Sequence, residues 1–244
     1  EGFDTASSVV QTIDDTFLLI GAATRLGQQV PTLAVLKLDA QFAQIVDKNF
    51  PYHQLNLSPQ SAAGLDAARD AAGNVHLVGR YRPDGNDPTN SRILRMRLYS
   101  SGVPSGASLV IEPQLEGADE GRSIAFLSDD SRVQVDLIQT NAPHRELQIR
   151  RFNPDSVTLW HQAFQAGPSH EPRAVGVNAF DQILVVGFEE VYDQDNTMYR
   201  QILLRAGRTQ RVPRERLGRA DPRHLLAEDL AHRPQLGQIT HGRG

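Results

Sequence analysis

Two polar loops of the sequence hold the oxygen-bearing side chains that could bind a metal ion. The loops are RPDGNDPTNS (82–91) and YDQDNT (192–197), and each gathers carboxylate and amide groups within a few residues. Clustered oxygen ligands of this kind suit Ca²⁺, although both loops lack the bidentate glutamate and the spacing of an EF-hand loop. Solvated turns are therefore the competing interpretation, and no other cofactor is expected. The calcium candidates are Asp84, Asn86, Asp87, Asp193, Asp195 and Asn196.

No established catalytic motif occurs in the chain. The sequence lacks G-x-S-x-G, H-E-x-x-H, a P-loop, and G-x-G-x-x-G after a strand. GRSIA (121–125) comes near the first pattern, but it opens an apolar segment and is interpreted as structural. The absence of cysteine excludes a thiol nucleophile and cysteine-ligated zinc. The sequence therefore supports no catalytic residue.

The histidines outside the C-terminal segment show no metal-ligand spacing. One of them, His161, follows the single tryptophan and is expected to face outward beside a packed indole ring. The histidines considered are His53, His76, His144, His161 and His170.

A four-fold repeat organises most of the chain. Each copy has a short apolar segment, a polar turn, a strongly apolar strand, a loop and a further strand. The first three copies add a fourth strand, read as AQIVDKNF, ASLVIEP and VTLWHQAF. The copies cover residues 7–50, 63–111, 121–164 and 172–205.

The second strand of each copy is the clearest signal. These strands read FLLIG, VHLVG, VQVDL and ILVVG, and each follows a turn rich in Asp, Asn and Gly, which favour chain reversals. Their closing residues are spaced 58, 58 and 50 apart. The closing residues are Gly21, Gly79, Leu137 and Gly187.

Short strands at close intervals predict an all-β fold, and four strands per period of this length predict a β-propeller blade. A β-sandwich with accidental similarity between its halves is the alternative. We expect residues 1–205 to form about four four-stranded blades, as a truncated part of a larger propeller. Terminal blades should then expose apolar faces and unpaired edges, through which copies could self-associate.

The combination of D-x-x-F-L-L-I-G with L-x-K-L-D-A resembles the blade repeats of large exported bacterial propeller proteins. The resemblance covers most of residues 6–205, is clearest in the first copy, and weakens in the third, where Leu137 replaces the glycine. It implies a ring scaffold, a role that is mostly unassigned, and no catalytic residue that maps onto this chain. An extracellular, periplasmic or cell-surface location follows as an expectation.

The C-terminal segment 206–244 differs in composition from the rest. It holds 8 arginines against 4 acidic residues, whereas residues 1–205 carry a net charge of −8. One permitted DNA coding of Arg205 to Thr209 would encode Arg-Leu-Asp-Ala if a single G were removed. QILLR would then continue like LAVLKLDA (33–40), so we interpret 206–244 as frameshifted or unstructured. The alternatives are a genuine basic extension, with a short helix at 221–232 begun by Asp221 and Pro222, or a tail that binds nucleic acid or acidic lipid.

These features predict a non-enzymatic propeller scaffold or binding module. The alternatives are a hydrolase or lyase with its active site on the loop face, and a ligand-sensing ectodomain. The acidic body argues against a nucleic-acid partner, so an unknown protein or carbohydrate is expected. No run of 18 apolar residues occurs, so no membrane span is expected in this chain.

Overall fold

The structure is a computed structural model. It describes residues 5–24, 30–43, 61–84, 87, 89–102, 110–112, 118–141, 144–164, 169–192 and 198–208. The chain divides into two compact units, Glu1–Thr209 and Gln210–Gly244, and the second lies outside the described residues. The described part contains strands and no helix, so it holds no helix able to cross a membrane.

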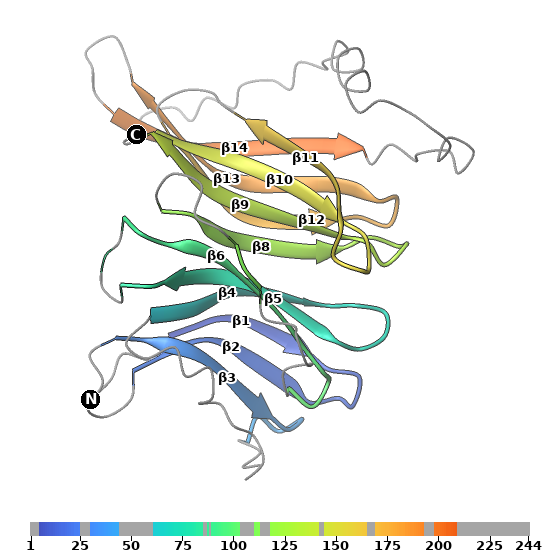
Figure 1. The fold of residues 1–244 in the computed structure, drawn as a ribbon. Coiled ribbons are helices and arrows are strands. Elements are labelled where there is room, and N and C mark those ends of the chain that lie inside the picture. Colours follow the sequence, from blue (N-terminus) through green and yellow to red (C-terminus); the bar gives the residue numbers. More distant parts are fainter. Residues whose placement is uncertain are drawn as a thin grey trace, which may run out of the picture. The chain divides into compact units, whose positions relative to one another are not determined.

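The strands form four antiparallel sheets that follow one another in chain order (Figure 1). The first sheet contains β1 (Thr5–Gln11), β2 (Phe17–Ala23) and β3 (Thr32–Leu38). The second contains β4 (Ser61–Arg69), β5 (Val75–Arg82), β6 (Arg92–Leu98) and β7 (Val110–Ile111). The third contains β8 (Glu120–Phe126), β9 (Arg132–Asn141), β10 (His144–Phe152) and β11 (Thr158–Phe164), and the fourth β12 (Ser169–Val177), β13 (Gln182–Tyr192) and β14 (Met198–Arg208).

This arrangement confirms the all-β, propeller-like prediction. The first strands of the sheets, β1, β4, β8 and β12, lie side by side, as the innermost strands of propeller blades do. The fourth strand VTLWHQAF matches β11, whereas ASLVIEP pairs only at Val110–Ile111. Nearly all of AQIVDKNF lies outside the described residues.

The C-terminal boundary differs from the sequence prediction by a few residues. Strand β14 continues to Arg208, and its last residues pair with the start of β13. The strand therefore runs beyond Arg205, where the repeat was expected to end. The remainder of the Arg-rich segment and the expected helix at 221–232 lie outside the described residues, and the frameshift interpretation stays a prediction.

The polar turns between the first two strands have one geometry in all four sheets. In each turn a residue one or two positions before the second strand has a positive φ, between 57° and 87°. These residues are Asp15, Gly73, Asp130 and Asp181. Asp and Gly tolerate the left-handed region, which explains the recurrence of these residue types.

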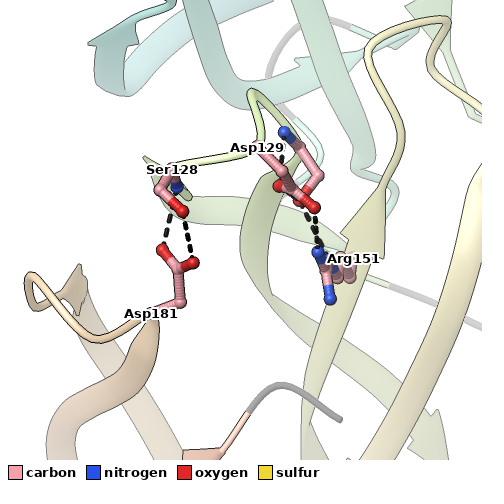
Figure 2. A network of polar contacts seen from close by, with 5 residues as sticks. Ser128, Asp129, Arg151 and Asp181 are labelled. Carbon is pink, nitrogen blue, oxygen red and sulfur yellow. Dashed lines mark hydrogen bonds and ion pairs between the residues drawn. The ribbon is translucent and has the colours of Figure 1, made fainter. Parts of the chain in front are cut away.

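The turns also connect neighbouring sheets. Oδ1 of Asp130 accepts a hydrogen bond from the Ala71 amide at 2.9 Å, and Oδ1 of Asp181 accepts one from the Ser128 amide at 2.8 Å. Figure 2 shows the second contact, beside the ion pair between Asp129 and Arg151 at 2.6 Å. The two later junctions thus use the positive-φ aspartate of the later sheet to hold the turn of the earlier one, whereas the second sheet has Gly73 at this position.

A glycine position follows from the pairing of the first two strands. Gly21, Gly79 and Gly187 lie opposite the inner strand, where an added Cβ would stand 1.8 to 2.3 Å from a backbone carbonyl oxygen. Pairing with Gly121 places Asp136 at this position in the third sheet. The sequence-based alignment with Leu137 was therefore wrong by one residue, because the apolar pattern of VQVDL gives no glycine to fix the register.

Each inner strand contains a β-bulge directly after this position. The pairing shifts between Ala6 and Ser8, Gly64 and Asp66, Gly121 and Ser123, and Pro172 and Ala174. One residue of each strand therefore has no cross-strand partner, and bulges of this kind redirect side chains. These residues are Ser7, Leu65, Arg122 and Arg173.

Polar contacts join the inner strands beyond the bulges. Asp66 accepts hydrogen bonds from the hydroxyl groups of Ser8, at 3.0 Å, and Ser123, at 2.5 Å. The Ser123 oxygen also accepts a hydrogen bond from the Val175 amide at 3.0 Å. Three side chains thus connect all four sheets, and Ser123 of GRSIA serves this contact.

Two separate apolar cores hold the sheets in pairs. The core between the first and second sheets includes Leu18, Ile20 and Leu94, and the core between the third and fourth includes Val135, Leu147 and Val185. Successive side chains of a strand point to opposite faces, so the apolar residues at alternate positions of these strands form one buried face of each sheet. The junction between the second and third sheets is different and contains charged side chains, described below.

A buried histidine is held at the second turn. Nε2 of His76 lies 3.0 Å from Oδ2 of Asp70, and the ring packs edge-on to Phe126 of the third sheet. Burial lowers the pKa of His76, and the positive charges of Arg132 and Arg97 act in the same direction. Asp70 opposes this shift without reversing it, so the imidazole is neutral at pH 7.

We expect this histidine to reduce stability in mild acid. Because the folded pKa lies below the ordinary value of 6.5, the unfolded chain binds the proton more readily, and stability is lost as pH falls below about 6.5. Thermal unfolding at pH 7.5 and 5.5 should show a larger fall in Tm for the wild type than for His76→Gln. Equal falls in the two proteins would assign the acid effect to other groups.

Candidate functional site: glutamate and arginine pairs at the start of the inner strands

The third inner strand begins with a buried carboxylate. Glu120 is the first residue of β8, is only 7% exposed, and lies between two guanidinium groups. Nη1 of Arg80, from β5, is 3.2 Å from Oε1, and Nη2 of Arg122, from the bulge, is 2.6 Å from Oε2. The second contact is an ion pair without hydrogen-bond geometry. The site therefore draws side chains from two sheets to one carboxylate.

A second buried carboxylate precedes it directly. Oδ1 of Asp119 accepts a hydrogen bond from the Gln139 amide at 3.2 Å, and the Asp119 amide donates to the Ser91 carbonyl at 3.0 Å. The Gln139 side chain in turn accepts from the Ala118 amide at 3.2 Å. These contacts fix the entry of the chain into β8. They therefore hold in place the backbone that carries Glu120.

The same glutamate–arginine pattern recurs in the fourth inner strand. Glu171 pairs with Phe188 as Glu120 pairs with Leu137, and the bulge follows two residues later in both strands. Nη2 of Arg173 is 2.8 Å from Oε1 of Glu171. Because β8 and β12 lie side by side, two equivalent glutamate–arginine pairs occupy the starts of neighbouring inner strands.

The two pairs differ in their surroundings. The Glu120 side chain is nearly covered, whereas the Glu171 and Arg173 side chains are more open to solvent. The Nε atom of Arg122 is buried and makes no hydrogen bond among the described residues. A charged donor with free capacity beside an enclosed carboxylate is an arrangement able to bind a polar ligand.

Sequence reasoning missed these pairs. It searched for established catalytic motifs and for metal-ligand spacing, and these pairs match neither. The detectable signal was the repeated pattern E-G-R (120–122) and E-P-R (171–173), in matching places before the second strand. The register of the bulges makes the equivalence visible.

A charged layer lies between the second and third sheets. Asp136, which is completely buried, contacts Arg150 at 2.6 Å, and Arg150 contacts Glu112 of the second sheet, also at 2.6 Å. Glu112 forms a further ion pair with Arg95. The side chains of this layer thus alternate in charge across the junction.

Burial and neighbouring charges shift the ionisation of this layer. Burial raises the pKa of Asp136, which Arg150 opposes, while the carboxylates of Asp136 and Glu112 outweigh burial and raise the pKa of Arg150. Burial, together with neighbouring guanidinium groups, lowers the pKa of Arg132 to about 10. The Phe152 ring lies under three guanidinium groups, those of Arg95, Arg132 and Arg150, at 4.6 to 5.4 Å.

The calcium candidates of the first loop lie partly within the described residues. Asp87 accepts hydrogen bonds from the amide and hydroxyl of Thr89, at 2.8 and 2.7 Å, and Asp84 accepts one from the Asn90 amide group. Asn86, Asp193, Asp195 and Asn196 lie outside the described residues. Within the described part of the chain, no group of three or more His, Cys, Asp or Glu residues is placed to hold a metal ion. The calcium site stays a prediction.

Comparison with known proteins gives a fold likeness and no family. No family model matches the chain, and no curated protein matches it. Among solved structures, the chain is similar to the endo-arabinase from Bacteroides thetaiotaomicron VPI-5482, with a TM-score of 0.46 and 11% sequence identity. The match covers 80% of this chain and 72% of that one.

This comparison corrects the functional expectation from the sequence. The expected non-enzymatic scaffold is wrong on this finding, since the similar solved structure is that of an enzyme. At this identity the likeness concerns the fold. The activity has to be argued from the side chains of this chain.

Proposed function

We propose that the protein is a hydrolase or lyase that works by acid–base chemistry at the start of its inner strands. The observation that supports this most is Glu120, a buried carboxylate between guanidinium groups of two sheets, with Glu171 at the equivalent place on the next inner strand. Enzymes that cleave glycosidic bonds use two carboxyl groups, one as acid and one as base or nucleophile. The two glutamates supply such a pair.

The difference in environment assigns roles within this proposal. Glu120, with two compensating positive charges, is suited to act as the carboxylate that accepts a proton or attacks the substrate. Glu171 is more open to solvent and is suited to exchange protons with it. Arg122 and Arg173 would stabilise negative charge that develops on the substrate.

A polysaccharide is the proposed substrate class, in keeping with the carbohydrate partner considered from the sequence. The guanidinium groups favour a substrate with an anionic group, because arginine binds carboxylates in a bidentate manner. Linear arabinan and polygalacturonate are suitable neutral and anionic probes. Export or display at the cell surface belongs to the same proposal and is supported by the repeat resemblance alone.

Substitution of Glu120 tests the proposal. We expect Glu120→Gln to lower kcat on the cleaved polysaccharide by about a hundredfold, since one acid–base group contributes on that order. Reducing-end release measures cleavage by either route, and ultraviolet absorbance of the unsaturated product identifies a lyase.

The matched control is Asp155→Asn, the same chemical change in an exposed turn of the third sheet. It should leave kcat unchanged. Unfolding temperatures of both variants establish that the loss is not a folding defect. Full activity in a folded Glu120→Gln protein would contradict the assigned role.

A further inference from the structure

The fourth sheet exposes an apolar face, whereas the equivalent face of each of the other three sheets is buried. The residues three and five positions after the positive-φ turn residue are Leu18 and Ile20 in the first sheet. Both face the second sheet. The corresponding residues are His76 and Val78 in β5 and Val133 and Val135 in β9, and all four are buried. In β13 they are Leu184 and Val186, exposed at 42% and 37%.

Phe188 extends this face along the same strand. It is 36% exposed and alternates with the buried Ile183, Val185 and Gly187, which face the third sheet. A strand with apolar side chains on both faces is characteristic of a sheet packed on two sides. The sequence of β13 therefore matches that of an interior sheet, although only one of its faces is covered in this unit.

The first sheet presents the complementary face. Phe17 and Leu19 of β2 occupy the positions that, in β5, are taken by the fully buried Val75 and Leu77, which pack on the preceding sheet. Val9 of β1 pairs with Leu19 on this same outward face and is exposed. The first sheet thus has the surface by which a later sheet packs on an earlier one.

The turns repeat this complementarity in their polar groups. At the two later junctions, the positive-φ aspartate accepts a hydrogen bond from an amide in the preceding turn. Asp15 stands at that aspartate position in the first sheet. Ala179 stands at the amide position of Ser128 in the fourth sheet, two residues before Asp181. The first and fourth sheets therefore carry both halves of one more junction.

We propose that the outer face of the β12–β13–β14 sheet binds the β1–β2–β3 sheet of a second copy of this chain. Val186 and Phe188 of one copy pack on Leu19 and Val9 of the other, and Asp15 accepts a hydrogen bond from Ala179. The contact is head-to-tail, so it forms a closed ring if the rotation between copies closes, and a longer assembly otherwise. This continues the junction already present within the chain.

The association state of the full chain tests this surface. Sedimentation equilibrium across a range of concentrations should give the wild type a mass above that of one chain. Val186→Asp places an unpaired charge in the apolar contact and should raise the dissociation constant about tenfold or more. Because β13 already exposes this side chain, the variant should fold, which circular dichroism verifies.

Two further variants make the outcome specific. Asp15→Gly removes the proposed turn contact, and Gly73 shows that glycine occupies this position in a neighbouring turn, so the dissociation constant should rise without loss of fold. Val157→Asp, an equal change at an exposed site in the β10–β11 turn, should associate like the wild type. A wild type with the mass of one chain at every concentration would overturn the proposal. So would undiminished association of Val186→Asp.

Discussion

Arg150→Met is expected to lower the free energy of unfolding by about 3–5 kcal/mol, the usual cost of removing one partner from a buried ion pair. The Arg150 guanidinium contacts both Asp136 and Glu112, each at 2.6 Å. Methionine fills much of the volume but leaves Asp136, which is completely buried, without its positive partner. Urea unfolding at pH 7 measures the change.

Two comparisons identify the uncompensated charge as the cause. Arg173→Met breaks the more exposed pair with Glu171 and should cost no more than about 1 kcal/mol. The double variant Asp136→Leu with Arg150→Met removes both charges and should recover most of the lost stability. If the double variant is as unstable as Arg150→Met, lost packing explains the effect instead.

Gly79→Ala is expected to lower the free energy of unfolding by about 3 kcal/mol, the upper end of the usual cost of overpacking. An added Cβ would stand 2.0 Å from the carbonyl oxygen of Ala63 on the inner strand. Because this clash involves backbone atoms of two paired strands, the strands would have to move apart. No side chain could rotate to relieve it. The third sheet accommodates a side chain, that of Asp136, at the equivalent position. The cost of Gly79→Ala therefore comes from the position of the Ala63 carbonyl oxygen in the second sheet.

Gly176→Ala is the matched control in another inner strand. Apart from Gly176 and its two chain neighbours, no residue has an atom within 4 Å of the position that an added Cβ would take, so stability should change by no more than about 0.5 kcal/mol. Thermal and urea unfolding of both variants give the comparison. Equal stability of Gly79→Ala and wild type would show that the inner strand moves freely at this point.

Much of the fold follows from local patterns in the sequence. The apolar second strands and the Asp- and Gly-rich turns before them predict four sheets, and the structure has them at these places. These signals are local, because a turn requires particular residue types and a buried strand requires apolar ones. The glycine spacing identifies the correct register wherever a glycine is present.

The candidate site could not be predicted in the same way. Glu120 and Arg80 are 40 residues apart in the chain, and only the packing of the third sheet on the second brings them together. Asp136 was assigned to the wrong position, since the repeat lacks glycine there and the alignment followed the apolar residues of VQVDL. Where a residue departs from the repeat, contacts with a neighbouring sheet determine its type. A single sequence does not reveal those contacts.

The charged layer between the second and third sheets influences which sheets pack next to one another when the chain folds. Two sheets joined by leucine and valine side chains alone can accept many neighbours, and repeat proteins misassemble when equivalent segments exchange places. At this junction Arg150 pairs with Asp136 of its own sheet and with Glu112 of the second sheet, and Glu112 pairs in turn with Arg95. We expect the first or fourth sheet to pack poorly at this junction, so that the four similar sheets pack in only one order.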